Sequence, residues 1–457
     1  MSSTSPTSAT SAGTQHEVNH RALAAILLAV ALATLDTAIA NTALPAIAAD
    51  LNASPAASIW VINAYQLTVV ASLLPFAALG DLFGPRRIYL GGLAFFTLAS
   101  LGCALAHSLP QLAAARALQG LGAGALMSVN IALIRAIYPI ERLGRGVGFN
   151  ALVVGVAFAV GPTVASLVLA VAPWPWLFAI NVPLGLVALA FAWPTLPQAE
   201  RRGHGFDPIA ALLTCLSFSA LIFALGAAAQ REDGRLVGAA LAAALVLGAL
   251  LVRRERGHPA PMLPLDLLRR PMFALSAITA LAAFATQSLA FVSLPFLFEQ
   301  ALHRDPVQTG FLMSPWPIVV ALAAPIAGRL SDRYPPGLLG GIGLALLCLG
   351  MASMAWLPAE PSATEIALRM MVCGAGFGFF QSPNLKALMS SAPAARSGGA
   401  SGVIGMVRLI GQSSGAALVA LCFGLGGGAQ GAAWALALGA GFAALAATAS
   451  FARLWAR

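Results

Sequence analysis

The sequence predicts an all-α, polytopic membrane protein built from two six-helix bundles with a two-helix hairpin inserted between them. Of its 457 residues, 59% are hydrophobic and only 9% are charged, whereas a soluble domain averages about 45–50% apolar and about 25% charged residues. The apolar residues lie in long runs, and a bilayer span takes about 20 such residues. The composition therefore argues against a soluble enzyme, a nucleic-acid-binding protein and a disordered chain.

Apolar runs, cut at charges and at Gly/Pro clusters, give fourteen expected spans in three groups. The N-terminal bundle (21–194) holds spans 22–45, 58–79, 88–107, 109–137, 146–171 and 176–194. The hairpin (208–252) holds spans 208–228 and 236–252, and the C-terminal bundle (272–457) holds spans 272–298, 308–328, 338–357, 363–388, 399–424 and 429–452. Cytoplasmic loops 195–207 and 253–271 flank the hairpin, and the Ser/Thr-rich segment 1–20 is expected to be a disordered cytoplasmic N-terminus. Span 236–252 has no polar side chain, so we expect it to face lipid and to take no part in chemistry.

The distribution of basic residues supports this count. With the N-terminus inside, only three of the 25 Lys and Arg residues fall in outer loops, namely Arg231, Arg235 and Arg304. Another three fall inside spans, namely Arg116, Arg369 and Arg408, and all others fall in inner segments. Because cytoplasmic loops retain Lys and Arg, this split predicts both termini in the cytoplasm and a multi-pass protein of the cytoplasmic (inner) membrane.

The two six-helix groups resemble each other at a steady offset. Asp81 follows the second span as Asp332 follows the tenth, and Arg116 in the fourth span corresponds to Arg369 in the twelfth. Segment 142–144 corresponds likewise to 396–398. Such spacing indicates a duplicated six-helix unit, and parallel duplication with a site between the halves is a common transporter plan.

No metal, cofactor or enzymatic centre is expected. The five cysteines lie inside apolar runs without CxxC spacing, so we interpret them as small buried hydrophobes. The sequence shows no nucleophile–base constellation and no nucleotide-binding loop, which predicts a transporter that runs on an ion gradient. The net charge of +9 does not indicate nucleic acid, because the basic residues are scattered through short loops rather than gathered on one face.

Four motifs carry a resemblance to a known family. Segment 35–45 reads Leu-Asp-Thr-Ala-Ile-Ala-Asn-Thr-Ala-Leu-Pro, and segment 79–87 reads Leu-Gly-Asp-Leu-Phe-Gly-Pro-Arg-Arg. Segment 116–124 reads Arg-Ala-Leu-Gln-Gly-Leu-Gly-Ala-Gly, and the fifth span carries Gly155 and Gly161-Pro162. In this order and with fourteen spans, the chain after residue 20 resembles the major facilitator superfamily, in particular its fourteen-helix drug:proton antiporter branch.

The resemblance implies roles for these motifs. Gly155, Gly161 and Pro162 would form the antiporter motif, which ends here in Ala165-Ser166 rather than in two glycines. The loop after the second span would act as a conformational latch that joins the two bundles when the cavity opens outward. The implied latch residues are Asp81, Arg86, Arg87, Arg142 and, in the second half, Asp332. The loop motif opens with Ala77 where the family usually has glycine, and its second copy lacks the trailing basic pair.

Asp36 is the only one of sixteen acidic residues that lies well inside an expected span. An intramembrane carboxylate costs about 3 kcal/mol or more to place and marks a functional site by default; the structural alternative is an ion pair with Arg116 or Arg408. Burial favours the neutral form of a carboxyl group and a nearby arginine favours the charged form. A carboxyl group on which burial and an arginine act in opposite directions can exchange a proton as its surroundings change. We therefore expect proton coupling by Asp36 and Arg116, a role that the resemblance also implies.

Two polar stripes at helical spacing mark a candidate cavity. Arg116 is followed by Gln119 and Asn130 on one face, and Arg408 lies on a face with Gln412. Such faces either pack against other helices or line a water-filled cavity, and we expect the cavity because a guanidinium tolerates lipid poorly. The candidate substrate contacts are Asn41, Tyr65, Gln119, Asn130, Asn150, Gln287, Phe291, Trp316, Gln381, Asn384, Arg408 and Gln412. Arg369, Glu299 and Glu365 lie near outer span ends, where we expect them to reach solvent.

These features predict a secondary active transporter that exports amphipathic drugs or toxic compounds, which we expect to be cationic, by proton antiport and alternating access, and so confers antibiotic resistance. One alternative is a proton-coupled exporter of a single endogenous metabolite, and another is an uncoupled facilitator or channel. An anionic or zwitterionic substrate also stays open, because one deep carboxylate faces two arginines in the expected cavity. The expected partners are a small-molecule substrate, protons and the lipid bilayer, with the protein functioning as a monomer.

Overall fold

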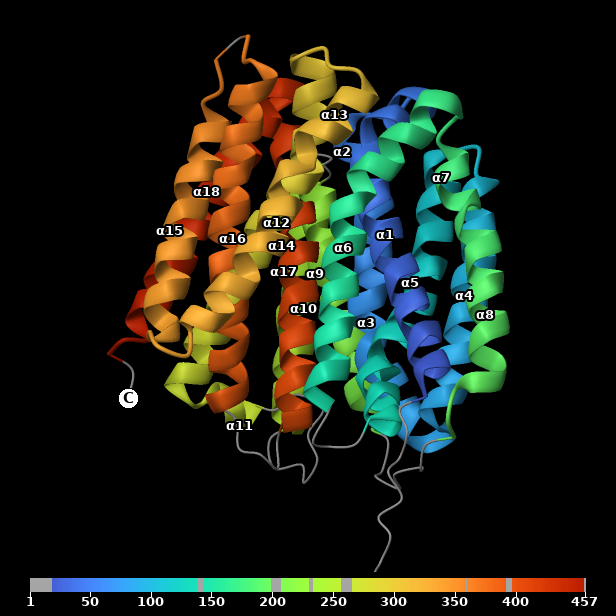
Figure 1. The fold of residues 1–457 in the computed structure, drawn as a ribbon. Helices are drawn as coiled ribbons and strands as arrows, with labels where there is room; N and C mark the ends of the chain where they lie inside the picture. Colours follow the sequence, from blue (N-terminus) through green and yellow to red (C-terminus); the bar gives the residue numbers. More distant parts are fainter. Residues whose placement is uncertain are drawn as a thin grey trace, which may run out of the picture.

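The computed structural model describes residues 19–138, 143–198, 207–229, 233–255, 265–358, 360–391 and 397–455. Within these ranges the chain forms helices and no strands, and the long helices stand side by side (Figure 1). Thirteen of the described helical segments are long and apolar enough to cross a membrane. The expected seventh span is helix α9, whose described apolar part is Pro208–Leu221. The predicted fold class is therefore confirmed.

The helices fall into two bundles and a hairpin, and several short helices continue a longer one. The N-terminal bundle contains α1 (His20–Asp50), α2 (Pro55–Ser58), α3 (Trp60–Phe83), α4 (Pro85–Ala104), α5 (Leu109–Ile137), α6 (Leu143–Val171), α7 (Pro175–Ala179) and α8 (Asn181–Thr195). The hairpin is α9 (Pro208–Ala229) and α10 (Gly234–Glu255). The C-terminal bundle contains α11 (Leu265–Leu268), α12 (Pro271–Phe296), the π-helical turn η2 (Leu297–Ala301), α13 (Pro306–Met313), α14 (Pro315–Leu330), α15 (Pro336–Ala355), α16 (Ala363–Ser391), α17 (Ser397–Gly426) and α18 (Gly428–Ala452).

The expected internal repeat appears in space as two matching glycine contacts. A Cβ on Gly122 of α5 would lie 2.8 Å from the Gly92 carbonyl oxygen of α4. In the second bundle, a Cβ on Gly376 of α16 would lie 2.6 Å from the Gly343 carbonyl oxygen of α15. Small residues let helix backbones approach closely in a membrane protein. Corresponding helix pairs of the two bundles thus pack closely through glycines in the same way.

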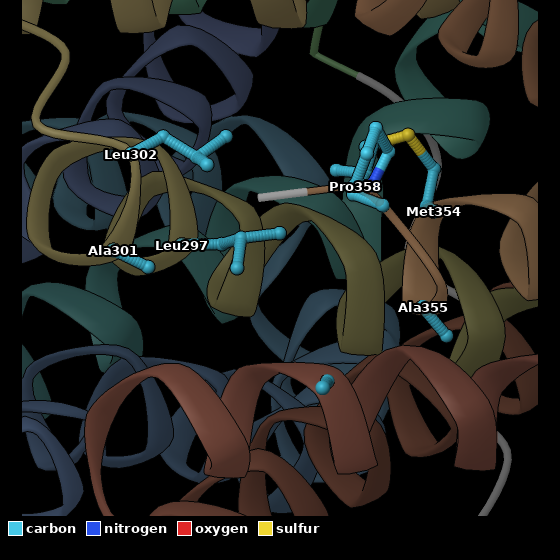
Figure 2. A pocket seen from close by; sticks show the side chains of 8 residues that line it. Leu297, Ala301, Leu302, Met354, Ala355 and Pro358 are labelled. Carbon is cyan, nitrogen blue, oxygen red and sulfur yellow. The ribbon is translucent and has the colours of Figure 1, made fainter. Parts of the chain in front are cut away.

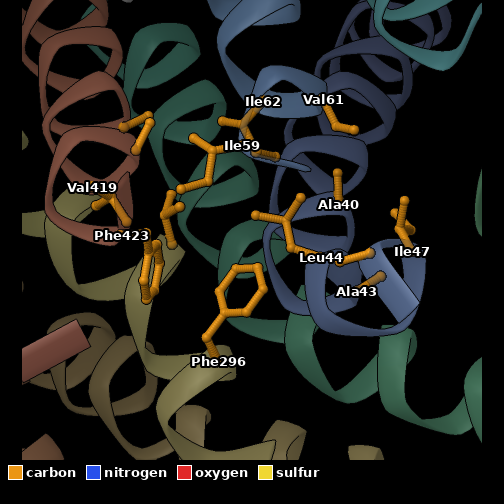
Figure 3. Close-up of a cluster of buried hydrophobic side chains, with 14 of the residues drawn as sticks. Ala40, Ala43, Leu44, Ile47, Ile59, Val61, Ile62, Phe296, Val419 and Phe423 are labelled. Carbon is orange, nitrogen blue, oxygen red and sulfur yellow. The ribbon is translucent and has the colours of Figure 1, made fainter. Parts of the chain in front are cut away.

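The two bundles meet in an apolar cluster at the end of the molecule that carries α2, here termed the α2 end. Leu44, Ile59 and Ile62 of the N-terminal bundle belong to one buried cluster with Phe296, Val419 and Phe423 of the C-terminal bundle (Figure 3). The rings of Phe296 and Phe423 pack edge to face with centroids 5.0 Å apart. We call these six residues the seal. The opposite end, which carries the start of α1 and the end of α18 (Figure 1), is termed the terminal end.

The hairpin is more closely integrated than the sequence indicated. The sequence predicted a position only for span 236–252, towards lipid, whereas the structure packs α9 against α3 of one bundle and α17 of the other. The Cys215 thiol of α9 donates a hydrogen bond to the Ala71 carbonyl oxygen of α3 at 2.8 Å. Helix α10 packs on α9 and is exposed along nearly all of its length, which agrees with a lipid-facing span.

At the terminal end, one carboxylate joins the two hairpin helices. Arg254 donates a hydrogen bond to Asp207 at 2.7 Å, and this bond lowers the pKa of the Asp207 carboxyl group. Asp207 also accepts hydrogen bonds from the first turn of α9, at the Ile209 and Ala210 amides. It therefore caps one helix while it pairs with the other.

Prediction: Gly122→Val and Gly376→Val each lower the free energy of unfolding by about 1–3 kcal/mol, because the added side chain overpacks a helix crossing. Thermal unfolding of the purified protein in detergent measures the effect. Gly91→Val is the matched control, since a Cβ there would meet no atom within 4 Å. An unchanged melting temperature in both crossing variants would contradict the close packing.

Candidate functional site: a buried charge network and a polar face between the bundles

Asp36 lies at the centre of a hydrogen-bond network inside the N-terminal bundle. Its Oδ2 pairs with Arg116 Nη1 at 2.5 Å, and the two side chains are 1% and 0% exposed. Its Oδ1 accepts hydrogen bonds from Gln119 Nε2 at 2.9 Å and from Asn181 Nδ2 at 2.6 Å. The carboxylate is thus held by side chains of α5 and α8, and its charge is compensated within the bundle.

The partners of Asp36 are themselves held in place. Gln119 Oε1 accepts a hydrogen bond from Arg116 Nη1 at 2.5 Å, and Gln119 Nε2 also donates to Ser100 Oγ at 2.8 Å. Arg116 Nε donates to the Val61 carbonyl oxygen at 3.1 Å, and its guanidinium lies over the Tyr65 ring at 4.1 Å. The network therefore joins α1, α3, α4, α5 and α8 around one charge pair.

This arrangement corrects the expected position of three candidate cavity residues. Arg116, Gln119 and Tyr65 were expected to line a water-filled cavity, but in this structure all three are buried within the N-terminal bundle. Helical spacing identifies the shared face of Arg116 and Gln119, but it does not say which neighbour that face meets. Their contact with Asp36 instead corresponds to the ion-pair alternative.

Sequence reasoning missed Asn181. It is fully buried, begins α8 and donates one of the three hydrogen bonds to Asp36. A signal was present, because Asn181 is the only amide or charged side chain in the expected span 176–194. Its partner lies 145 residues earlier in the chain, so only the fold could identify the contact.

The antiporter motif packs directly beside the charge network. A Cβ on Gly161 of α6 would lie 2.3 Å from the Ala38 Cβ of α1, two residues after Asp36. One turn further on, α6 contacts the C-terminal bundle: Thr163 and Ser314 share a hydrogen bond of 2.9 Å, and Ser166 Oγ donates to the Pro306 carbonyl oxygen at 2.7 Å. Helix α6 therefore connects the neighbourhood of Asp36 with the contact between the bundles.

Two glycines nearer the terminal end have free space beside them. A Cβ on Gly155 of α6 or on Gly405 of α17 would meet no atom within 4 Å. Gly405 lies on the stripe of Arg408 and Gln412, of which the latter donates to Gln287 Oε1 of α12 at 3.4 Å. Arg408 is half-buried, its Nε is buried without a partner, and among the described residues no hydrogen bond or ion pair reaches its guanidinium.

An aromatic group begins one turn beyond Gln287 on α12. Phe291 of α12 packs edge to face on Trp316 of α14, with ring centroids 5.3 Å apart, and on Phe158 of α6, with centroids 5.0 Å apart. The contact between Phe158 and Phe291 joins the two bundles. The Trp316 indole Nε1 is buried and has no hydrogen-bond acceptor among the described residues.

The other candidate cavity residues separate into distinct places. Asn130 and Asn150 hydrogen bond to each other at 2.8 Å, Gln381 is exposed, and Asn41 is buried with an unpaired Oδ1. Asn384 is also buried, but it accepts a hydrogen bond from Arg453 at 2.7 Å within the C-terminal bundle. We expected Arg453 to be a loop charge; it is instead 3% exposed and holds α12, α16 and α18 together through Ser276, Asn384 and Ser450.

The expected latch residues lie at the terminal end. Asp81 and Arg87 are exposed, and Arg86 donates to the Trp193 carbonyl oxygen of α8 at 2.5 Å. Gly84 between them has a φ of 93°, which favours glycine and permits the sharp step from α3 to α4. Asp332 pairs with Lys386 of α16 at 2.6 Å. Arg142 lies outside the described residues.

Three charged residues expected near outer span ends lie at the α2 end. Arg369 pairs with Glu365 one turn away on α16, and it also donates to the carbonyl oxygens of Ser353 and Trp356 at the end of α15. Arg369 is thus the sequence equivalent of Arg116 without its buried network. Glu299 is half-buried in the π-helical turn η2.

An apolar pocket of about 310 Å³ also lies at the α2 end, inside the C-terminal bundle. Its lining includes Leu297, Ala301, Leu302, Met354 and Pro358, and no polar side chain (Figure 2). It shares no residue with the Asp36 network or with the polar face of Arg408, so we do not regard it as the functional site.

The fold and its buried charges are those of a multi-helix membrane transporter. The chain belongs to the Major Facilitator Superfamily, whose family model matches residues 26–416. It is 51% identical to the uncharacterized transporter YebQ of Escherichia coli over 88% of each chain. It is 30% identical to the riboflavin transporter RibZ of Clostridioides difficile over 87% of each chain. It is also 30% identical to the multidrug resistance protein Stp of Mycobacterium tuberculosis, over 84% of this chain and 72% of that protein.

A solved structure supports the fold. The POT family transporter PepTSo superimposes with a TM-score of 0.71 at 16% identity, over 95% of this chain and 98% of that one. At this identity the likeness concerns the fold alone. The chain is therefore a multi-pass membrane transporter with the helix arrangement of its family.

Prediction: Arg116→Gln destabilises the protein by about 3–5 kcal/mol, because it leaves the Asp36 carboxylate buried without its countercharge. The double variant Asp36→Asn, Arg116→Gln recovers most of this loss, because it removes both charges. Thermal unfolding in detergent compares the variants, with Arg235→Gln at an exposed position of the hairpin as the control. A double variant as unstable as Arg116→Gln would show that the loss does not arise from an unpaired charge.

Proposed function

We propose that this protein is a proton-coupled antiporter that exports amphipathic small molecules from the cytoplasm by alternating access. The observation that carries the proposal is the wholly buried pair of Asp36 and Arg116. Charged groups at membrane depth are expensive and mark proton and substrate pathways. Protonation of Asp36 would cancel the charge that faces Arg116 and so weaken the network that joins five helices.

The proposed orientation places both termini in the cytoplasm of a cell whose cytoplasmic membrane holds the protein as a monomer. The strong bias of Lys and Arg toward the terminal end supports this sidedness. With the seal closed at the α2 end and open space at Gly155 and Gly405, the described conformation is then the inward-facing one. Release of substrate to the outside requires the seal to part.

A physical route connects the proton site with the seal. Asp36 and Ala38 both lie on α1, and the Ala38 side chain packs against α6 at Gly161, where α6 has no side chain. Two and five residues after Gly161, Thr163 and Ser166 of α6 bond to Ser314 and Pro306 of the C-terminal bundle. A shift of α1 on protonation of Asp36 would therefore displace α6 and change the contact that closes the α2 end.

Two alternatives remain as separate proposals. Export of one endogenous metabolite is favoured by the likeness to a riboflavin transporter, at the same identity as the likeness to a multidrug resistance protein. An uncoupled facilitator would need no buried titratable group, so the position of Asp36 argues against it. The cation preference expected from the sequence is not part of the proposal, because the one deep carboxylate is already paired with Arg116.

Prediction: Asp36→Asn abolishes uphill transport and preserves downhill exchange, because the amide keeps the side-chain shape and cannot carry the proton. Accumulation of a fluorescent substrate in proteoliposomes, with and without an imposed pH gradient, separates the two activities. Glu360→Gln, at an exposed position, is the control and should retain both. If Asp36→Asn accumulated substrate like the wild type, the proton site would have to lie elsewhere, and Glu299 would be the next group to test.

Prediction: Asp81→Asn weakens the outward-facing state and increases access from the cytoplasmic side. If the latch contributes about 1 kcal/mol, the state ratio changes about fivefold. The measure is labelling of Gly405→Cys by a membrane-impermeant thiol reagent, in a protein whose five native cysteines are replaced by alanine. Asp233→Asn in the hairpin is the control. Equal labelling rates with and without Asp81→Asn would remove the latch from the proposal.

A further inference from the structure

Arg408 differs from the other deep arginine in having no countercharge. It follows the start of α17 at Ser397 by eleven residues, which places it about 16 Å along the helix axis. Among the described residues, no hydrogen bond or ion pair reaches its guanidinium, and its Nε is buried without a partner. The described residues therefore supply no negative charge to this half-buried side chain, and a negatively charged ligand would complete the pairing.

The position of Arg408 on α17 directs it between neighbouring helices. Gly411 and Gly415 of α17 abut the α12 backbone, where a Cβ on either would lie 2.5 Å from a carbonyl oxygen. Leu409 belongs to a cluster with residues of α3, including Tyr65. Arg408 lies on the arc between these two contact faces, together with Gly405, beside which there is open space. A ligand therefore has room to approach the guanidinium.

The polar face that carries Arg408 also carries amide groups. Gln412, one turn along α17, is joined to Gln287 of α12 at 3.4 Å. Phe291 and Trp316, further along the C-terminal bundle, contact each other and are each 1% exposed, so they offer no surface to a ligand in the described conformation. The face at Arg408 therefore supplies a positive charge and two amide groups.

We propose that the transported substrate is an organic anion whose oxyanion pairs with Arg408. This inference rests on the proposed function, since it assigns the substrate of the same transporter. A guanidinium matches a carboxylate or sulfonate in geometry as well as in charge. A cationic substrate finds no free carboxylate at this depth, because Asp36 is closed off by Arg116, and it would be repelled by Arg408.

The test measures binding of three naphthalene probes that differ only in charge: naphthoate, naphthylmethanol and naphthylmethylammonium. Isothermal titration calorimetry of the purified protein in detergent gives their affinities without a pH gradient. We expect naphthoate to bind at least about tenfold more tightly than the neutral alcohol, and the cation to bind most weakly. Arg408→Gln should reduce naphthoate affinity about tenfold or more and change alcohol binding less than about twofold.

Arg408→Lys keeps the charge without the guanidinium fork and should retain part of the preference. Arg235→Gln, in the exposed start of α10, should bind all three probes like the wild type. The proposal is overturned if wild-type protein fails to bind naphthoate, if it binds the alcohol or the cation as tightly, or if Arg408→Gln keeps the preference. Because no gradient is imposed, loss of proton coupling in Asp36→Asn leaves this result unaffected, so the two proposals fail separately.

Discussion

The buried pair of Asp36 and Arg116 is the interaction on which the N-terminal bundle depends. Either charge alone would be expensive at this depth, and together they are stable only with further hydrogen bonds to the remaining donors and acceptors. Gln119 and Asn181 supply these bonds to the carboxylate, and the Val61 carbonyl oxygen supplies one to the guanidinium. The requirement for partners on several helices constrains how α1, α3, α5 and α8 approach one another.

The two bundles use deep arginines in opposite ways. Arg116 is compensated inside its own bundle, whereas the described structure offers Arg408 no partner. Close packing transmits any change at the first site, because α1 and α6 touch through Ala38 and Gly161 without a side chain between them. The second site lies on a face that borders open space. The proposed proton site and the proposed ligand site are therefore separate groups in separate bundles.

Much of the fold could be predicted because its signals are local. A bilayer demands long apolar helices, and the charges between them indicate which loops share a side. The repeat was visible in Asp81 and Asp332, and the structure extends it to the glycine contacts of α4 with α5 and α15 with α16. The place of α9 could not be predicted, because its apolar pattern is equally compatible with a lipid-facing helix and with one packed between α3 and α17.

The sequence by itself determined the class of fold, the order of the long apolar helices and the exceptional position of Asp36, since a lone carboxylate in an apolar run needs no tertiary information to stand out. Only the tertiary structure decided the partners. Arg116 and Gln119 face Asp36 rather than a cavity, Asn384 faces Arg453, and Asn181 completes the network. The physical reason is that helical periodicity defines the polar face of each helix, whereas the direction of that face within the bundle depends on how all the other helices pack.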